Sequence, residues 1–328
     1  MTDLRKQAPR PFDFYPAWSE TRTGDSPLTP FEESVILSAL PPGAGVKAVC
    51  PAKSWAFFPL RITAVLPGDE EQTIYFKKEA LIGGGEREAR ILLALSKLGL
   101  TVPTLQAGPV LDTERPGTGS VLVLRELPGE NVLSWCWEGN GEILGAASRL
   151  VLEGVEKLHG LTEAMSEEDA GRDLPRRTLR QELQGILDRS GPWMEEAVFS
   201  DAAKRLAPRL DRIETPLVFS NGDYNPANFL HRDGEISGYL DFAWSCFEDP
   251  LYGFTKYWTY DWYPLNHAGL VEKYLYRHGL TRKEFAPRLA LRCLWTLQRE
   301  TSVEGSDEAS YRDTLLRLLH EAMDSLER

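Results

Sequence analysis

The first part of the chain alternates apolar and polar positions over short runs, as half-buried strands do. Two such runs, residues 61–67 and 73–78, are separated by Gly and acidic residues and predict a hairpin. Residues 86–98 instead repeat their apolar side chains every three to four positions, which predicts a helix. Residues 121–124 predict a further strand, closed by Pro-Gly. The segment therefore indicates a small lobe built mainly of strands.

From about residue 132 onward the pattern is helical. Leu144, Ala147, Val151, Val155 and Leu158 share one helical face. A β interlude interrupts the helices at residues 229–242. Three further helical segments are predicted at residues 268–278, 281–299 and 308–326.

These patterns predict an α+β chain with a bilobal, protein-kinase-like fold. We expect a β-rich N-lobe at residues 38–127 and a larger helical C-lobe at residues 128–328. Residues 1–37 form an N-terminal extension, rich in Pro and Thr, whose aromatic residues predict an extended arm packed on a lobe.

The composition narrows the function classes. The chain has 328 residues, of which 42% are hydrophobic and 26% charged, as in a globular protein with a sizeable core. A net charge of −12 argues against nucleic acid and anionic membranes as partners. The sequence shows neither a signal peptide nor a membrane span, and its four Cys residues are scattered singly. We expect a cytoplasmic protein of undetermined oligomeric state.

One loop carries the most specific chemical signal. Asp223 is followed five residues later by Asn228, and Asp241 ends the next apolar run. Phosphoryl transfer uses side chains in this layout: one carboxylate orients the attacking hydroxyl, and an amide oxygen and a second carboxylate hold Mg²⁺ on the triphosphate. Each residue alone would also suit an ordinary turn, but the three together favour a catalytic loop.

The chain here resembles the aminoglycoside phosphotransferase and choline kinase family, small-molecule relatives of the protein kinases. The resemblance rests on Gly222-Asp223 with Asn228 and on Asp241-Phe242, supported by Asp249-Pro250 and by residues 124–129. It spans about residues 46–262. Residues 243–258 are also similar to the hygromycin-type branch. The resemblance implies ATP and Mg²⁺ as cofactors, Asp223 as the catalytic residue, and Asn228 and Asp241 as metal ligands. It also implies that the N-lobe binds the nucleotide and that the C-lobe carries the catalytic loop and the acceptor site.

Two positions depart from the family pattern. Asn221 stands where the family usually has His, and Gly253 stands where it usually has an acidic residue. We expect Asn221 to support the loop by hydrogen bonding. The acidic side chain missing at position 253 would tie a helix start to the catalytic loop.

A strand lysine is the candidate for the phosphates. Period-two alternation places Lys77 on one face of its strand and Lys78 on the other. A strand lysine can neutralise the α- and β-phosphates when an acid on a neighbouring helix holds it, and Glu88 is the best-placed acid. A solvated lysine pair is the alternative, and Lys78 and Glu86 are the fallback assignments.

The end of the last N-lobe strand is the expected hinge. Arg125, Glu126 and Leu127 would offer backbone groups to an adenine ring, as the resemblance implies. Gly83–Gly85 is not a phosphate-binding loop, because no Gly-Lys-Ser/Thr follows and the next residues are acidic. The loop over the nucleotide is placed at residues 53–56. His159, at the end of an apolar helix face, is interpreted as a packed structural residue.

An aromatic patch follows the metal loop. It contains Trp258, Asp261 and Trp262, and aromatic faces with an acid suit a sugar ring or a cation. Such clusters also occur as core, so both interpretations stay open. We assign these three residues to the acceptor. The acidic residues at 300–308 could help to bind a cationic acceptor but favour a solvated loop.

The sequence thus predicts an ATP- and Mg²⁺-dependent kinase for a small hydroxylated acceptor, such as an aminoglycoside, a sugar or an amino alcohol. The alternative is a catalytically weak or inactive nucleotide-binding protein on the same scaffold, motivated by the two departures. A metal-dependent hydrolase using the Asp and Asn cluster is disfavoured by the strand lysine and the hinge.

Overall fold

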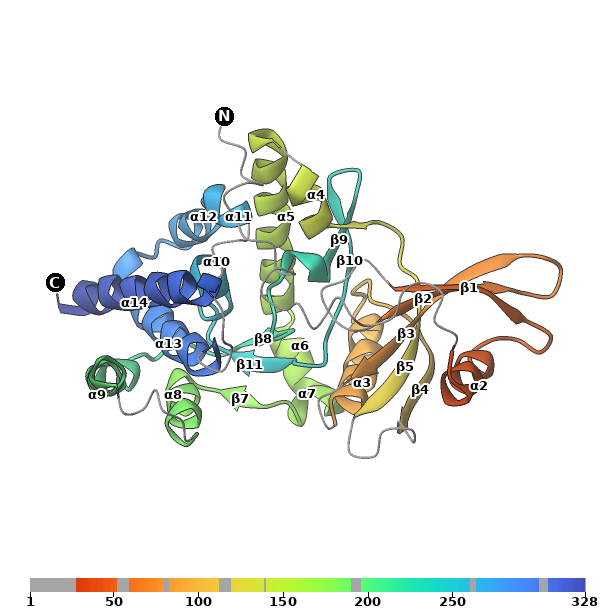
Figure 1. Cartoon of the computed structure of the whole chain (residues 1–328), viewed down its shortest axis with the longest axis horizontal. Helices are drawn as coiled ribbons and strands as arrows, with labels where there is room; N and C mark the ends of the chain where they lie inside the picture. Colours follow the sequence, from red (N-terminus) through yellow and green to blue (C-terminus); the bar gives the residue numbers. More distant parts are fainter. Residues whose placement is uncertain are drawn as a thin grey trace.

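The computed structural model describes residues 28–51, 59–79, 83–111, 119–138, 140–189, 196–259, 264–300 and 306–327. It combines a sheet-rich N-terminal part with a larger helical part, which lie side by side in Figure 1 and confirm the α+β, kinase-like fold class. The loop predicted over the nucleotide, residues 53–56, lies outside the described residues.

The N-terminal part is a five-stranded antiparallel sheet with one helix against each face. Its strands run in the order β1-β2-β3-β5-β4, so β5 enters between β3 and β4. The elements are α2 (Pro30–Ser38), β1 (Gly45–Pro51), β2 (Leu60–Val65), β3 (Glu71–Glu79), α3 (Gly84–Lys97), β4 (Leu105–Leu111) and β5 (Ser120–Arg125). The predicted hairpin, the helix and the strand at 121–124 are confirmed as β2–β3, α3 and β5, whereas β1 and β4 were not predicted.

The outer face of the sheet packs on α2. Ile74 and Phe76 of β3 point to this face and are fully buried with Val35 and Ile36 of the helix. The extended arm predicted for this segment is wrong for residues 30–38. Thr29 forms a capping box, since its hydroxyl accepts from the Glu32 amide (3.2 Å) while the Glu32 carboxylate accepts from the Thr29 amide (3.0 Å).

The inner face of the sheet packs on α3 and shares its core with the helical part. Leu122 and Leu124 of β5 join the buried side of α3, including Leu92 and Leu95, in one continuous apolar cluster with helices α5 (Gly141–His159), α8 (Leu179–Leu187), α9 (Ala197–Leu210) and α13 (Arg282–Glu300). This continuity packs α3, which carries Glu88, against the helical part.

The helical part is interrupted by two small sheets. Strands β6, β9 and β10 form one, and β7, β11 and β8 form the other. Its helices are α4 (Val132–Glu138), α5 (Gly141–His159), α6 (Thr162–Glu167), α7 (Asp169–Arg172), α8 (Leu179–Leu187), α9 (Ala197–Leu210), α10 (Lys256–Thr259), α11 (Pro264–His267), α12 (Leu270–Arg277), α13 (Arg282–Glu300) and α14 (Ser306–Glu327). Its strands are β6 (Glu130–Asn131), β7 (Arg176–Arg177), β8 (Val218–Ser220), β9 (Phe229–Arg232), β10 (Glu235–Tyr239) and β11 (Cys246–Glu248), and its 3₁₀ turns are η4 (Pro226–Asn228) and η5 (Gly253–Thr255).

The sequence predicted the long helices and a β interlude at residues 229–242, which the structure shows as the antiparallel pair β9–β10, and it missed the short strands β7, β8 and β11. These strands matter for the site because β8 ends at the catalytic loop and β11 holds β8 in register through Phe247 opposite Phe219. None of the described helices combines the length and the apolar character that a membrane span requires.

Candidate active site

The loop that follows β8 is built around Gly222 and Asp223. Gly222 has a φ of 79°, and a Cβ there would lie 2.2 Å from the carbonyl oxygen of Trp244, so only glycine fits. Its amide donates to the Ser220 hydroxyl (2.8 Å), and the Asp223 amide donates to Oδ1 of Asn221 (3.1 Å). Asn221 is buried, and it supports the loop by hydrogen bonding as the sequence predicted.

Asn228 is brought beside Asp241 by the backbone. The Leu240 amide donates to the Asn228 carbonyl (2.8 Å), which places the residue before Asp241 against the end of the loop. The Asn228 side chain donates through Nδ2 to the Asp223 carbonyl (3.0 Å), so Oδ1 is the atom that can bind a cation. An amide oxygen and a carboxylate are the ligand types that Mg²⁺ prefers, and the pair therefore fits this ion.

Lys77 lies between two carboxylates contributed by distant segments. Its Nζ is 2.6 Å from Glu88 Oε2 and 2.8 Å from Asp241 Oδ1. The amide of Phe242 donates to the other Glu88 oxygen (3.2 Å), which ties α3 to the segment after β10. Glu79 also approaches Lys77, at 3.8 Å. The Lys77–Glu88 ion pair expected from the sequence is present.

The charges of this cluster shift one another's protonation. Burial alone would lower the pKa of Lys77, but Asp241 and Glu88 outweigh it and raise that pKa above its ordinary value. Burial likewise pushes the pKa of Asp241 upward, and Lys77, aided by Lys256, more than offsets it, so the carboxyl titrates below its usual range. The lowered pKa favours the anionic form of Asp241, which the predicted metal-binding role requires.

The fallback residues face elsewhere. Lys78 pairs with the buried Glu32 of α2 (3.2 Å), on the outer face of the sheet. Glu86 accepts from the Ser120 hydroxyl (3.2 Å). The alternation of β3 thus separates the two lysines as predicted, and only Lys77 reaches the cluster with Asp241.

The expected hinge is held by side-chain and backbone contacts. The Arg125 amide donates to Thr104 O (2.8 Å) and the Glu126 amide to Thr73 O (3.3 Å), so these two N–H groups already have partners within the sheet. The Glu126 carboxylate accepts from Tyr75 (3.3 Å). Among the described residues, the Leu127 amide makes no backbone hydrogen bond of this kind. The nucleotide-binding roles of Arg125, Glu126 and Leu127 stay predictions.

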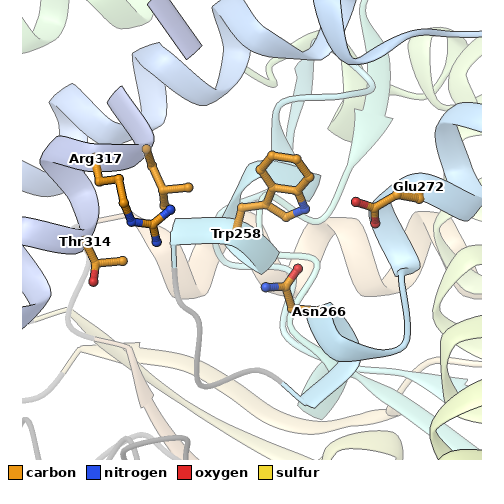
Figure 2. A pocket seen from close by; sticks show the side chains of 6 residues that line it. Trp258, Asn266, Glu272, Thr314 and Arg317 are labelled. Carbon is orange, nitrogen blue, oxygen red and sulfur yellow. The ribbon is translucent and has the colours of Figure 1, made fainter. Parts of the chain in front are cut away.

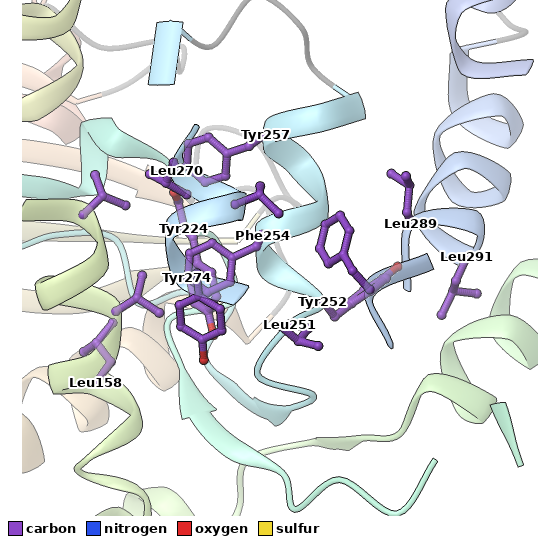
Figure 3. Close-up of a cluster of buried hydrophobic side chains, with 14 of the residues drawn as sticks. Leu158, Tyr224, Leu251, Tyr252, Phe254, Tyr257, Leu270, Tyr274, Leu289 and Leu291 are labelled. Carbon is purple, nitrogen blue, oxygen red and sulfur yellow. The ribbon is translucent and has the colours of Figure 1, made fainter. Parts of the chain in front are cut away.

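The catalytic loop is anchored by Tyr224, which sequence reasoning overlooked. The ring is buried among the aromatic residues Phe254, Tyr257 and Tyr274 (Figure 3). Its hydroxyl hydrogen-bonds to Nε2 of His159 (2.7 Å), and its carbonyl accepts from the Tyr257 hydroxyl (2.5 Å). His159 is therefore a packed structural residue, as the sequence predicted. Its hydrogen-bond partner, Tyr224, directly follows Asp223 in the chain.

Asp249 of the Asp-Pro pair makes a buried ion pair that was also not predicted. Arg288 of α13 donates to both of its carboxylate oxygens, at 2.7 and 3.1 Å, and to the Thr215 hydroxyl at 2.9 Å. Both charged side chains are at most 5% exposed. The pair fixes the segment after β11 to α13, and an Arg 39 residues away gave no sequence signal.

A family model matches most of the chain. The model of the APH phosphotransferase enzyme family matches residues 77–289, about two thirds of the chain. The chain belongs to this phosphotransferase family. The match begins at Lys77 and includes the loop of Asp223, Asn228 and Asp241. A comparison with curated proteins found no matching sequence.

Solved structures of phosphotransferases share the fold of this family member. A thermostable mutant of the aminoglycoside phosphotransferase APH(4)-Ia, in a ternary complex with ADP and hygromycin B, has a TM-score of 0.64 at 11% identity, covering 87% of this chain and 96% of that one. Choline kinase LicA from Streptococcus pneumoniae has a TM-score of 0.56 at 14% identity, covering 85% and 94%. LicA in complex with AMP has a TM-score of 0.59 at 15% identity, covering 90% and 100%.

In this phosphotransferase, Trp258 lines a cavity of about 250 Å³ between α10, α11, α12 and α14. In Figure 2, Glu272 lies on one side of the indole, Thr314 and Arg317 lie on the other, and Asn266 lies below it. The cavity thus offers an aromatic face with groups of both charges. Asp261 and Trp262 lie outside the described residues, so their acceptor roles stay predictions.

The side chain of Trp258 points away from the loop that carries Asp223. Two positions along a helix turn the side chain by about 200°, so Trp258 points away from Lys256, whose ammonium contacts Asp223. The indole packs edge-on against Phe285 of α13 at 5.4 Å between ring centroids. An acceptor that reaches both Asp223 and Trp258 must therefore extend along α10.

Proposed function

We propose that this phosphotransferase is an ATP- and Mg²⁺-dependent kinase that transfers the γ-phosphoryl group to a hydroxyl of a small molecule. The observation that carries the proposal is the convergence of Lys77, Glu88 and Asp241 within 2.8 Å contacts, next to the loop of Asp223 and Asn228. Phosphoryl transfer depends mainly on positioning and on neutralising charge, which are the two properties that this arrangement provides.

Each residue has a distinct role in this proposal. Lys77, held by Glu88, binds the α- and β-phosphates. Asn228 Oδ1 and Asp241 hold Mg²⁺, which when bound neutralises the phosphate charge. Asp223 accepts a hydrogen bond from the acceptor hydroxyl and orients its oxygen towards the γ-phosphorus. Arg125, Glu126 and Leu127 form the adenine edge of the site.

The acceptor is a small hydroxylated molecule, of the sugar, amino sugar or amino alcohol kind. The solved neighbours that contain hygromycin B together with a nucleotide support this class. The cavity at Trp258 gives the ring of such an acceptor an apolar face. Asp261 and Trp262 complete this acceptor site in our proposal.

We also propose a cytoplasmic setting for this kinase. The four free thiols are consistent with a reducing compartment of this kind.

The alternative of an inactive nucleotide-binding protein rests on the two departures, and the structure gives each a local explanation. Asn221 hydrogen-bonds the Asp223 amide, and Gly253 makes room for the Tyr224 ring. Neither change removes a side chain from the cluster around Lys77. The two departures therefore favour a loop that is supported by different contacts, and not a loop that has lost its function.

The test is a coupled ADP-release screen with MgATP over aminoglycosides, sugars and amino alcohols. We expect ADP release that depends on one acceptor class and that Asp223→Asn abolishes. A nucleotide-dependent rise in melting temperature without acceptor-dependent ADP release from any class would favour the binding protein. Turnover that is independent of ATP would favour a hydrolase.

A further inference from the structure

Lys256 pairs with the catalytic carboxylate, and the function proposed so far gives this lysine no role. Its ammonium contacts Oδ1 of Asp223 from the first turn of α10. The Lys256 side chain is 18% exposed and that of Asp223 26% exposed, so the pair lies in the site rather than on the open surface. A solvated surface lysine would instead be exposed and would need no acidic partner.

Asp241, the proposed metal ligand, has a different lysine beside it. Lys77 approaches Asp241 to 2.8 Å. Lys77 is thus the cation that contacts Asp241, and Lys256 is the cation that contacts Asp223.

The backbone on both sides of Lys256 is fixed. Thr255 is buried and its hydroxyl accepts from Nε of Arg292 (3.1 Å). Tyr257 is buried and its hydroxyl donates to the Tyr224 carbonyl (2.5 Å). The start of α10 is therefore held rigidly, while the lysine stem can move its ammonium between neighbouring oxygen atoms.

The geometry of transfer puts a phosphate where this ammonium lies. In the proposed kinase, the acceptor oxygen sits at Asp223 and the metal at Asn228 and Asp241. The γ-phosphoryl group would then lie between the two, in line with the acceptor oxygen, and a metal held by Asn228 and Asp241 would neutralise part of its charge. Resting on that function, we propose that Lys256 is a catalytic residue, which donates a hydrogen bond to a non-bridging oxygen of the γ-phosphoryl group during transfer.

The step balances without a change in the charge of Lys256. The acceptor oxygen forms a bond to the γ-phosphorus, and the bond from that phosphorus to the β–γ bridging oxygen breaks, its electron pair leaving on ADP. The hydroxyl proton passes to Asp223. The ammonium stays protonated, and its contact shifts from the Asp223 carboxylate to the phosphoryl oxygen as that carboxylate takes up the proton.

The test needs no identified acceptor. Fluoroaluminate with MgADP mimics the planar phosphoryl group, so the MgADP affinity is measured with and without it by calorimetry. For the wild type, fluoroaluminate should tighten MgADP binding. In Lys256→Met this gain should fall by about 10- to 100-fold, the effect of one charge-assisted hydrogen bond, with binding of MgADP alone unchanged. Lys256→Arg should keep the gain.

The control is Lys204→Met, which removes an exposed lysine of α9 and should behave as the wild type. Melting temperatures accompany every variant, and Lys256→Gln, a smaller change, should lose the gain as the Met variant does. An equal fluoroaluminate gain in wild type and Lys256→Met would overturn the inference and leave the kinase standing. A wild type that binds MgADP but gains no affinity from fluoroaluminate would likewise overturn the role of Lys256 and leave the kinase function standing. A wild type that binds no MgADP would contradict both the role of Lys256 and the proposed kinase function.

Discussion

The ring of Tyr224 occupies the space into which a side chain at Gly253 would project. A Cβ at position 253 would lie 2.4 Å from two carbon atoms of that ring. The family usually ties this point to the catalytic loop with an acidic side chain. Here an aromatic side chain reaches in from the loop itself, and it is fixed by His159 and Tyr257.

We predict that Gly253→Ala destabilises the protein. The added methyl forces the Tyr224 ring out of a close-packed cluster, which typically costs about 1–3 kcal/mol. The free energy of unfolding, from urea titrations, checks this. Since Tyr224 follows Asp223, kcat should fall as well. Gly185→Ala, in α8 with no atom within 4 Å of the added Cβ, is the control and should be neutral or slightly stabilising. Equal effects of the two changes would contradict the packing argument.

The two lysines of β3 should separate by phenotype. Lys77→Met should remove activity and weaken nucleotide binding, because Lys77 is the cation between Glu88 and Asp241. Lys78→Met should instead lower stability, since it takes a partner from the buried Glu32, and breaking a buried pair costs about 3–5 kcal/mol. Steady-state kinetics on both variants measure the loss of activity, and urea titrations measure the loss of stability. A larger activity loss in the Lys78 variant would show the assignment to be reversed.

The sequence predicted those features that depend on local periodicity. The alternation in β3 assigned Lys77 and Lys78 to opposite faces, and the helical repeats located α3, α5, α13 and α14. The spacing of Asp223, Asn228 and Asp241 identified one loop. These signals survive because the two-residue and 3.6-residue periods are visible along the chain itself.

Contacts between distant segments could not be predicted. Lys256 pairs with Asp223 across 33 residues and Arg288 pairs with Asp249 across 39, and neither pair forms a motif. Strand β11 is three residues long, too short for an alternation to show. The helix α2 was missed because Pro-rich flanking sequence suggested an extended arm, although Thr29 and Glu32 supply a capping box.

We predict that the protein becomes less stable as the pH decreases, partly because unfolding lets His159 take up a proton. Burial, with His278 nearby, lowers the pKa of His159 to about 4. The unfolded chain binds this proton at a pKa of about 6.5, so stability is full above that value and falls as the pH decreases towards 4, by about 2 kcal/mol at pH 5. Urea titrations at pH 7 and pH 5 measure the loss, which should be smaller in His159→Gln.

His320→Gln is the matched control for that experiment. His320 is exposed on α14, and its replacement should leave the pH dependence of the wild type intact. If His159→Gln lost as much stability as the wild type between the two pH values, the protonation of His159 would not be the cause.

We predict that Trp258→Ala raises the KM for the acceptor and leaves the KM for ATP unchanged. The indole lines the cavity of about 250 Å³ and points away from Lys256, which contacts Asp223. The effect should be largest for long acceptors that extend along α10. Leu316→Ala, a partly buried apolar change in α14 that is not part of this cavity's lining, controls for stability. A rise confined to the KM for ATP would place the acceptor elsewhere.

The most direct measurement compares wild type and Asp223→Asn with MgATP and the acceptor found in the screen, following the product by ³¹P NMR. The wild type should form a phosphate monoester of the acceptor together with an equal amount of ADP. Asp223→Asn should bind MgATP as the wild type does and lose about 10²- to 10⁴-fold in rate. A variant that forms the monoester at the wild-type rate would contradict the central claim.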